Sequence, residues 1–288
     1  MKIAFIGTGI MGSRMAHNLL KNNYDLIVCN RTKENAETLI RNGAKWAASP
    51  FEAALNADIL FTMLSEPQVV KDTAFGKNGF LSGMKKGSLW VDCSTVNPEF
   101  SKEMALKANE SGIRFIDAPA AGSKQPAEQG ELIFFTGGNK NDFEEVKPIL
   151  EKMGKKILYL GEAGKGTSMK MVVNLLLGAA IASFSEAMIL GESLGFDRET
   201  ILGVLIGASV TAPYLTAKKE KFLMNKYETE FPLKLMYKDL RLIQEAAVHC
   251  NINIPVTEVV KKLFFEANQN GYGELDFSAL YKFFLEKN

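Results

Sequence analysis

The sequence has few of the residues that most often bind catalytic metal ions. It contains two histidines, His17 and His249, and three cysteines, Cys29, Cys93 and Cys250, among 288 residues. None of them has the spacing of a zinc site, and no CxxC motif is present. We therefore expect no catalytic metal. An odd number of cysteines cannot all pair, so we also expect packed, free thiols in a reducing compartment, the cytoplasm.

The sequence also lacks an excess of either charge and a long, uninterrupted apolar run. Lys and Arg total 34, against 33 for Asp and Glu, so no long-range field attracts nucleic acid or an anionic membrane. The longest apolar stretch, Met171 to Phe184, contains Asn174 and is shorter than the roughly 18 residues of a membrane span. We expect a buried helix there. Met1 to Gly7 has the pattern of a strand, so a secretory signal is not expected.

The first half of the chain alternates strand-like apolar runs with helical patterns, which predicts a doubly wound, mainly parallel sheet. At roughly 150 residues per domain, 288 residues favour two domains. The helical patterns cover residues 10–21, 33–41 and 97–109, and the predicted strands are residues 2–7, 25–30, 57–64, 88–94, 113–119, 131–138 and 156–161.

After Gly166 the strand pattern gives way to long helical patterns. The first, from Met169 to Leu194, is nearly continuous, and Gly195 is a suitable C-terminal stop. We place the boundary between an α/β domain, residues 1–163, and an all-helical domain, residues 164–288, and expect a long helix to join them. Further helices are predicted at residues 198–206, 215–223, 233–250, 257–268 and 278–286.

The segment Gly7-Thr8-Gly9-Ile10-Met11-Gly12 is a GxGxxG motif that follows the first predicted strand and opens the first predicted helix. The first glycine permits a tight turn, the second lets a pyrophosphate approach the backbone, and the third lets helix pack on strand. The helix N-terminus then faces the phosphates. A purely structural turn is the alternative, but the strand–turn–helix context favours a dinucleotide site. Its expected cofactor contacts are Gly7, Gly9, Ile10, Met11 and Gly12.

The second predicted strand ends in Asn30-Arg31-Thr32. An acidic residue there would bind the ribose hydroxyls of NAD, but none occurs before Glu34. Arg31 instead offers a fork of donors that suits a 2′-phosphate, and Asn30 and Thr32 can add neutral hydrogen bonds. An ordinary surface arginine is the alternative. The segment favours NADP(H) as the cofactor.

Lys170 and Asn174 are four residues apart, so they share one face of a largely apolar helix. A lysine in that setting pays a desolvation cost unless it has a partner or a chemical task. Carbonyl reduction supplies a task, because an ammonium can stabilise and protonate the oxygen that gains negative charge. The alternative is a lysine whose stem packs while its head reaches solvent.

These motifs and three further segments make the sequence similar to the β-hydroxyacid dehydrogenase family. It looks most like the glyoxylate/succinic semialdehyde reductase and γ-hydroxybutyrate dehydrogenase subgroup, and the resemblance covers the whole chain. The segments are FIGTGIMGSRMAHNL from Phe5, NRT from Asn30, DCSTVNP from Asp92, DAPAAGSKQPAEQGEL from Asp117, GKGTSMKMVVN from Gly164 and FPLKLMYKDL from Phe231.

The resemblance implies an N-terminal NADP-binding Rossmann domain and an all-helical domain that carries substrate residues and forms a homodimer or homotetramer. It implies Lys170 as the general acid/base, with Asn174 beside it. The other positions that match the family's motifs are Ser94 and Thr95 beside the nicotinamide and the substrate, Gly122 and Ser123 in the loop that grips the substrate carboxylate, Phe231 and Asp239 in the active site, and Lys238 and the Met63-Leu64-Ser65 loop against the cofactor.

Each of these short matches also has an ordinary structural explanation. Ser94-Thr95, which precedes Asn97-Pro98, could be a helix-capping turn. Lys234, Lys238 and Arg241 could form a solvated helix face, and Phe231 could belong to the core. It is the complete set that favours the functional interpretation.

One departure concerns the substrate. The family pattern usually reads Asp-Ala-Pro-Val-Ser-Gly, with the serine hydroxyl on the substrate carboxylate, whereas this chain has Ala120 and Ala121. Gly122 and Ser123 would then hold the carboxylate, or the group bound beside Ala121 is less polar.

We expect NADPH-dependent reduction of a small aldehyde or keto acid, such as glyoxylate or succinic semialdehyde. A 3-hydroxyisobutyrate-type dehydrogenase acting oxidatively is the alternative enzyme. A non-catalytic binding module on a dehydrogenase scaffold is the alternative of another class, and such modules are expected to lose the lysine that this chain keeps.

Overall fold

The computed structural model describes residues 1–287, which divide into two compact units, Met1–Met171 and a second that begins at Val172. The division falls inside one long helix, α8 (Lys165–Ser193). The start of this helix belongs to the first unit because its first turn is hydrogen-bonded to the buried Asp117 carboxylate. The sequence predicts domains 1–163 and 164–288. That boundary falls just before α8, and it stays a prediction.

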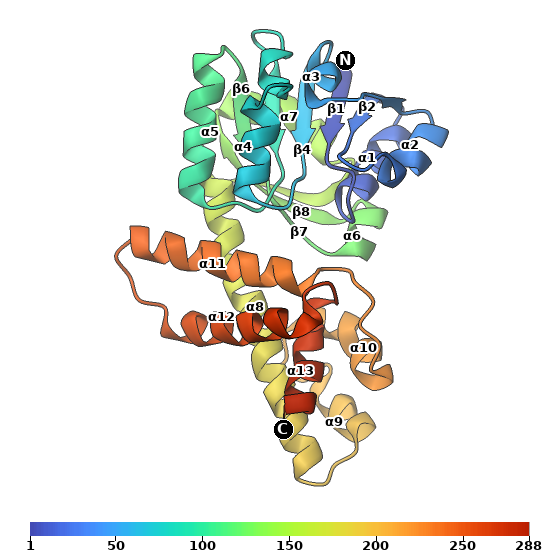
Figure 1. Ribbon diagram of the computed structural model, residues 1–288, viewed down its shortest axis with the longest axis vertical. Helices are drawn as coiled ribbons and strands as arrows, with labels where there is room; N and C mark the ends of the chain where they lie inside the picture. Colours follow the sequence, from blue (N-terminus) through green and yellow to red (C-terminus); the bar gives the residue numbers. More distant parts are fainter. Residues whose placement is uncertain (288) are drawn as a thin grey trace. The chain divides into compact units, whose positions relative to one another are not determined.

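The first unit is built on one nine-stranded sheet (Figure 1). Its strands are β1 (Lys2–Ile6), β2 (Asp25–Cys29), β3 (Lys45–Trp46), β4 (Ile59–Thr62), β5 (Leu89–Asp92), β6 (Arg114–Asp117), β7 (Ala120–Ala121), β8 (Leu132–Gly138) and β9 (Gly154–Tyr159). Six of them are parallel in the order β3-β2-β1-β4-β5-β6, and β8 continues the sheet antiparallel to β6. This is the strand order of the Rossmann fold, so the expected α/β, mainly parallel fold class is confirmed.

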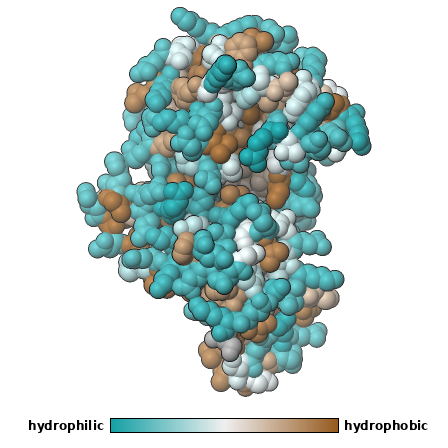
Figure 2. Space-filling view, in the orientation of Figure 1, coloured by the Kyte–Doolittle hydropathy of each residue, from teal (hydrophilic) through white to brown (hydrophobic). Residues whose placement is uncertain are grey.

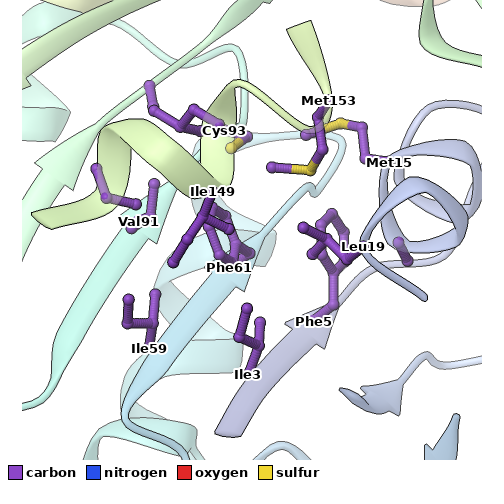
Figure 3. Close-up of a cluster of buried hydrophobic side chains, with 14 of the residues drawn as sticks. Ile3, Phe5, Met15, Leu19, Ile59, Phe61, Val91, Cys93, Ile149 and Met153 are labelled. Atoms are coloured by element: carbon purple, nitrogen blue, oxygen red, sulfur yellow. The ribbon is translucent and has the colours of Figure 1, made fainter. Parts of the chain in front are cut away.

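Two apolar cores lie on the two faces of this sheet. The central strands β1, β4 and β5 are therefore buried on both sides and are largely apolar. On β1, Ile3 and Phe5 enter one core while Ala4 and Ile6 enter the other, because successive strand side chains point to opposite faces. Figure 3 shows the first core, where Phe5 and Phe61 stack with ring centroids 5.9 Å apart.

The helices of the first unit include several that the sequence patterns did not predict. The missed helices are α3, α4, α6 and α7. Of these, α3 starts at Pro50 after the Ser49 cap, α4 starts at Pro67, α6 has only six residues, and α7 contains Pro148. The full set before α8 is α1 (Gly12–Lys21), α2 (Glu37–Arg41), α3 (Pro50–Ala54), α4 (Pro67–Phe75), α5 (Pro98–Glu110), α6 (Lys124–Gln129) and α7 (Lys140–Leu150).

The second unit is helical, as the sequence predicts. Gly195, at φ +93°, ends α8, and the Phe196 N–H bonds back to the Gly191 carbonyl at 3.1 Å, which is a helix stop that a glycine favours. The segment predicted as one helix over residues 215–223 is instead a short 3₁₀ turn, Pro213–Lys218, followed by a separate helix. The helices are α9 (Arg198–Leu205), α10 (Lys219–Met224), α11 (Leu233–His249), α12 (Pro255–Ala267) and α13 (Leu280–Lys287).

The expectation of a buried helix after Met171 is only partly right. In its most apolar 18-residue window 39% is buried, and Val172 and Leu176 are 57% and 65% exposed. By length and composition alone α8 could cross a membrane. One such helix is weak evidence for that, because a long core helix of a soluble protein has the same composition.

Candidate functional site

The three glycines of the GxGxxG loop are required for different steric reasons. Gly7 has φ +97°, and a Cβ there would lie 2.3 Å from the Met63 carbonyl oxygen. A Cβ on Gly12 would lie 1.9 Å from the Gly7 carbonyl oxygen, so the helix could not approach the strand. Apart from Gly9 and its two neighbours in the chain, no atom of residues 1–287 lies within 4 Å of the place where a Cβ on Gly9 would stand. Gly9 therefore faces open space, which suits the close approach of a ligand.

The N-terminal end of α1 is also suited to an anion. Within the described chain, this end has no side-chain cap and no acidic residue in its first turn, so its partial positive charge is not neutralised there. The Thr8 hydroxyl is buried and has no hydrogen-bond partner among residues 1–287. Ile10 and Met11 are half-buried beside it. A buried, unpaired hydroxyl and an uncapped helix end fit a pyrophosphate.

The end of β2 places two neighbouring polar residues in different roles. The Asn30 side chain accepts a hydrogen bond from the Thr8 N–H at 3.1 Å and donates one to the Thr32 carbonyl at 2.8 Å. Asn30 therefore holds the glycine loop in place. Arg31 is exposed and, in the part of the chain that the structure describes, has no hydrogen-bond or ion-pair partner. Its guanidinium is available to a ligand.

The loops after β4 and β5 are joined by Ser94. The buried Ser94 hydroxyl accepts from the Leu64 N–H at 2.9 Å, and the Ser94 N–H donates to Asp92 at 3.1 Å. This engagement favours a positioning role for Ser94, and its contact with substrate stays a prediction. Thr95 and Met63 are half-buried, and Ser65 is exposed. The cap of α5 is Asn97, whose side chain accepts from the Phe100 N–H.

The residue after Ala121 is Gly122, whose backbone conformation favours glycine. Ala121 pairs with Ile133 at the edge formed by β7 and β8. Gly122 follows at φ +127°, and a Cβ there would lie 2.7 Å from the Leu132 side chain. Ser123 precedes α6, but its hydroxyl does not cap this helix within residues 1–287. The Gly122 N–H and the Ser123 hydroxyl are therefore candidate donors to an anion.

Lys170 lies in the second turn of α8, and its side chain is buried, with the residue 8% exposed. The first turn of this helix is fixed by a carboxylate that the sequence reasoning did not single out. Asp117, at the end of β6, accepts hydrogen bonds from the Gly164 N–H at 2.7 Å and from the Thr167 N–H at 2.7 Å. Burial raises the pKa of Asp117 to about 6, and the accepted hydrogen bonds from Gly164 and Thr167 limit that rise.

In the second unit, the buried residues Asn174, Lys238 and Asp239 form one network. The Asn174 Nδ2 donates to Asp239 Oδ2 at 2.6 Å, and the Lys238 Nζ lies 2.9 Å from Asp239 Oδ1. Lys238 is therefore not part of a solvated helix face, whereas Lys234 and Arg241 are exposed and pair with Glu274 and Glu245.

The orientation of the Asn174 amide follows from this network. Because its Nδ2 points to the Asp239 carboxylate, its Oδ1 points elsewhere. That oxygen is buried and finds no hydrogen-bond partner among the described residues. A buried acceptor without a donor marks a place where a ligand hydroxyl or a water can bind.

Phe231 is half-buried beside the start of α11, and its ring lies 5.4 Å from the Phe277 ring. Its backbone N–H donates to the Asp276 carboxylate, which also lies 3.0 Å from the buried Lys218 Nζ. Lys218 and Asp276 were not identified from the sequence, because 58 residues separate them. They fix the backbone of Phe231.

Comparisons with known proteins cover nearly the whole chain. A family model described as the NAD binding domain of 6-phosphogluconate dehydrogenase matches residues 2–161. A second, described as "NAD-binding of NADP-dependent 3-hydroxyisobutyrate dehydrogenase", matches residues 164–284.

Two curated relatives and one solved structure illustrate the similarity. Glyoxylate/succinic semialdehyde reductase 2, chloroplastic, of Arabidopsis thaliana is 39% identical over 97% of this chain and 78% of its own length. The 2-(hydroxymethyl)glutarate dehydrogenase of Eubacterium barkeri is 36% identical over 98% of this chain and 94% of its own length. A crystal structure of 3-hydroxyisobutyrate dehydrogenase from Salmonella typhimurium is 25% identical, covers 98% of this chain and 99% of its own, and superposes with a TM-score of 0.92.

Two alanine substitutions separate folding from cofactor binding in the glycine loop. Gly12→Ala forces a Cβ against the Gly7 carbonyl, so we expect the free energy of unfolding to fall by about 1–3 kcal/mol. Gly9→Ala meets no described atom within 4 Å, so its thermal stability without cofactor should stay near that of the natural chain. Its affinity for the nicotinamide cofactor should fall about tenfold or more, since the methyl group occupies the space expected for the pyrophosphate.

Thermal denaturation and a fluorescence titration with NADPH measure the two effects. A Gly9→Ala variant that binds NADPH as tightly as the natural chain would contradict this assignment of the loop.

Proposed function

The chain belongs to the β-hydroxyacid dehydrogenase family and is an NAD(P)-dependent oxidoreductase, and from this premise we propose that it reduces small aldehyde or keto acids with NADPH. Glyoxylate and succinic semialdehyde are the proposed substrates, because they appear in the name of the Arabidopsis relative. The observation that carries the proposal is a buried lysine, Lys170, one helical turn before a buried amide, Asn174, whose oxygen lacks a partner among residues 1–287.

In the proposed reaction, a nicotinamide cofactor held at the Gly7–Gly12 loop would supply the hydride that reduces the carbonyl carbon. The Lys170 ammonium gives its proton to the carbonyl oxygen as negative charge grows there, which yields the hydroxy acid. The Lys170 amine then takes a proton from water. Asn174 Oδ1 can accept a hydrogen bond from the new hydroxyl, and Asp239 holds the amide in that orientation. In the reverse direction Lys170 is the base that takes the hydroxyl proton. Oxidation of a 3-hydroxyisobutyrate-type acid is therefore the second candidate function, and the fold shared with the Salmonella enzyme favours it.

Replacement of Lys170 by methionine tests this proposal, because methionine keeps most of the bulk and removes the ammonium. Loss of a general acid typically costs roughly 10²–10⁴ in rate, so we expect kcat to fall by that order. The Kd for NADPH, measured by fluorescence, should stay within about twofold, since the cofactor residues are untouched. Normal turnover in Lys170→Met would show that the lysine is structural.

We propose NADP(H) as the preferred cofactor because the unpartnered Arg31 guanidinium follows β2, where NAD-specific sites carry an acidic residue. The Met63-Leu64-Ser65 loop and Thr32 would flank the adenosine. Within the described residues, Gly9, the Thr8 hydroxyl and the uncapped end of α1 are free to receive the pyrophosphate.

Arg31→Ala should therefore weaken NADPH far more than NADH. Loss of one charge-assisted contact costs about 1.5–3 kcal/mol, or roughly ten- to a hundredfold in Kd. Titrations of both cofactors against the natural and variant chains measure the ratio. Lys33→Ala is a matched control of the same charge change two residues away, where the ammonium lies over the Trp46 ring. An equal loss for NADPH and NADH in Arg31→Ala would contradict the assignment.

We propose that the substrate carboxylate binds the Gly122 N–H and the Ser123 N–H and hydroxyl. Ala121 cannot donate a hydrogen bond, and successive backbone N–H groups form an anion-binding concavity. Thr95 would line the same site, and Ser94 would position its loop. This arrangement keeps small carboxylic acids as substrates without the serine of the family pattern.

Ala121→Ser restores that serine and should lower KM for glyoxylate and succinic semialdehyde with little change in kcat. A hydrogen bond to a charged group contributes about 1.5–3 kcal/mol, equivalent to a KM roughly ten- to a hundredfold lower. Steady-state kinetics on both acids measure the effect. If neither chain reduces either acid, the proposed substrates are wrong, although the dehydrogenase assignment stands.

We also propose that a second copy of the chain covers part of the helical unit, as a homodimer or homotetramer. Val248, Ile252, Val256 and Val259, at the end of α11 and the start of α12, are each more than half exposed. Figure 2 shows apolar side chains at this turn. Soluble monomers rarely leave such side chains grouped in water.

The three free cysteines, two of them buried, suit the reducing cytoplasm that we propose as the location.

A further inference from the structure

Asp117 ends β6 with a buried carboxylate that is used as the cap of another element. Its Oδ1 accepts from the Gly164 N–H at 2.7 Å, and its Oδ2 accepts from the Thr167 N–H at 2.7 Å and the Thr167 hydroxyl at 3.1 Å. These donors belong to the first turn of α8 and the residue before it. Because the first N–H groups of a helix have no partners within the helix, a carboxylate in this place satisfies them and complements the helix dipole.

Glycine backbone packs tightly against the Asp117 carboxylate and fixes its position. A Cβ on Gly137 would lie 2.7 Å from Asp117 Oδ1, and a Cβ on Gly166 would lie 2.8 Å from Oδ2. The same Cβ on Gly166 would lie 2.3 Å from the Phe135 carbonyl oxygen. Only glycine fits at either place. The Ser101 and Thr167 hydroxyls, 2.9 Å apart, close the arrangement on the side of α5.

The capped turn leads directly to the buried lysine. Lys170 follows Thr167 by three residues, so it lies on the neighbouring turn and the same side of the helix. After Asp117, the chain continues through β7 to Gly122 and Ser123. One carboxylate therefore joins the start of the segment proposed to bind substrate to the start of the helix that carries the proposed acid.

We propose that Asp117 is a positioning residue for the reaction, which sets the place of the Lys170 ammonium by fixing the first turn of α8. The proposal rests on the proposed role of Lys170 as the general acid. Asp117 makes no contact with the substrate or the cofactor in this account. Its effect passes through the helix, and small displacements of a reacting group are costly in rate.

Asp117→Asn is the main test, since asparagine has the same shape. Its amide oxygen can accept from one of the two backbone N–H groups, whereas its NH₂ group then faces the other donor. We expect kcat to fall about tenfold, while the Kd for NADPH stays within about twofold. Hydrogen exchange of residues 164–170 should become faster in the cofactor-free chain, because the turn has lost an acceptor.

A double-mutant cycle separates positioning from a general loss of structure. If Asp117 acts through Lys170, Asp117→Asn in the Lys170→Met background should lower the residual turnover by less than about twofold, since the group being positioned is absent. Ser101→Ala is the control, because it removes a neighbouring hydroxyl and leaves every contact of Asp117. Its turnover should stay within about twofold of the natural value.

An equal loss of turnover from Asp117→Asn in both backgrounds, or unchanged exchange of residues 164–170, would overturn the proposal and leave Lys170 as the acid. Normal turnover in Lys170→Met alone would instead overturn the proposed function on which it rests. If Asp117→Asn does not fold, Thr167→Val takes its place. It removes only the hydroxyl donor, and the same comparison in both backgrounds decides the outcome, with a smaller expected loss of about two- to threefold.

Discussion

Parallel strand pairing is the constraint on which the candidate site of the first unit depends. Because β1 pairs in parallel with β2 and β4, and β5 with β4 and β6, the carboxyl ends of all these strands meet at one edge of the sheet. Ligands of open α/β sheets bind at that edge. The residues delivered there are Gly7 after β1, Asn30 and Arg31 after β2, Met63 after β4, Ser94 after β5 and Asp117 at the end of β6.

The loops at this edge are held by buried polar contacts between neighbouring strand ends. Asn30 bonds to the Thr8 N–H, and Ser94 accepts from the Leu64 N–H. Asp92 accepts from the Thr62 hydroxyl, which in turn accepts from the Trp90 indole N–H at 2.8 Å. Buried polar groups that are satisfied in this way define one arrangement of the loops. The groups left unpaired among residues 1–287 include the Thr8 hydroxyl and the Asn174 Oδ1, and both lie where a ligand is proposed.

Features encoded locally were predicted from the sequence, and features that depend on distant partners were not. The GxGxxG loop, the alternation of strands and helices in the first half and the long helix follow from short-range patterns. The sequence pattern predicts that the long helix starts at Met169, whereas it begins at Lys165. Its first turn was missed because the side chain that caps it, Asp117, lies about 50 residues earlier in the chain. The internal use of the Ser94 hydroxyl depends on Leu64, 30 residues away. The available signal for Asp117 was an aspartate at the end of a predicted strand, two residues before Pro119.

The central claim is that the chain reduces small aldehyde acids with NADPH. The most direct measurement follows NADPH absorbance when the purified natural chain is mixed with glyoxylate or with succinic semialdehyde, with an aldehyde that lacks a carboxylate as the control. The account predicts saturable NADPH consumption with at least one of the acids and much weaker consumption with the control aldehyde. A chain that binds NADPH but consumes it with neither acid, or equally with the control, would contradict the account.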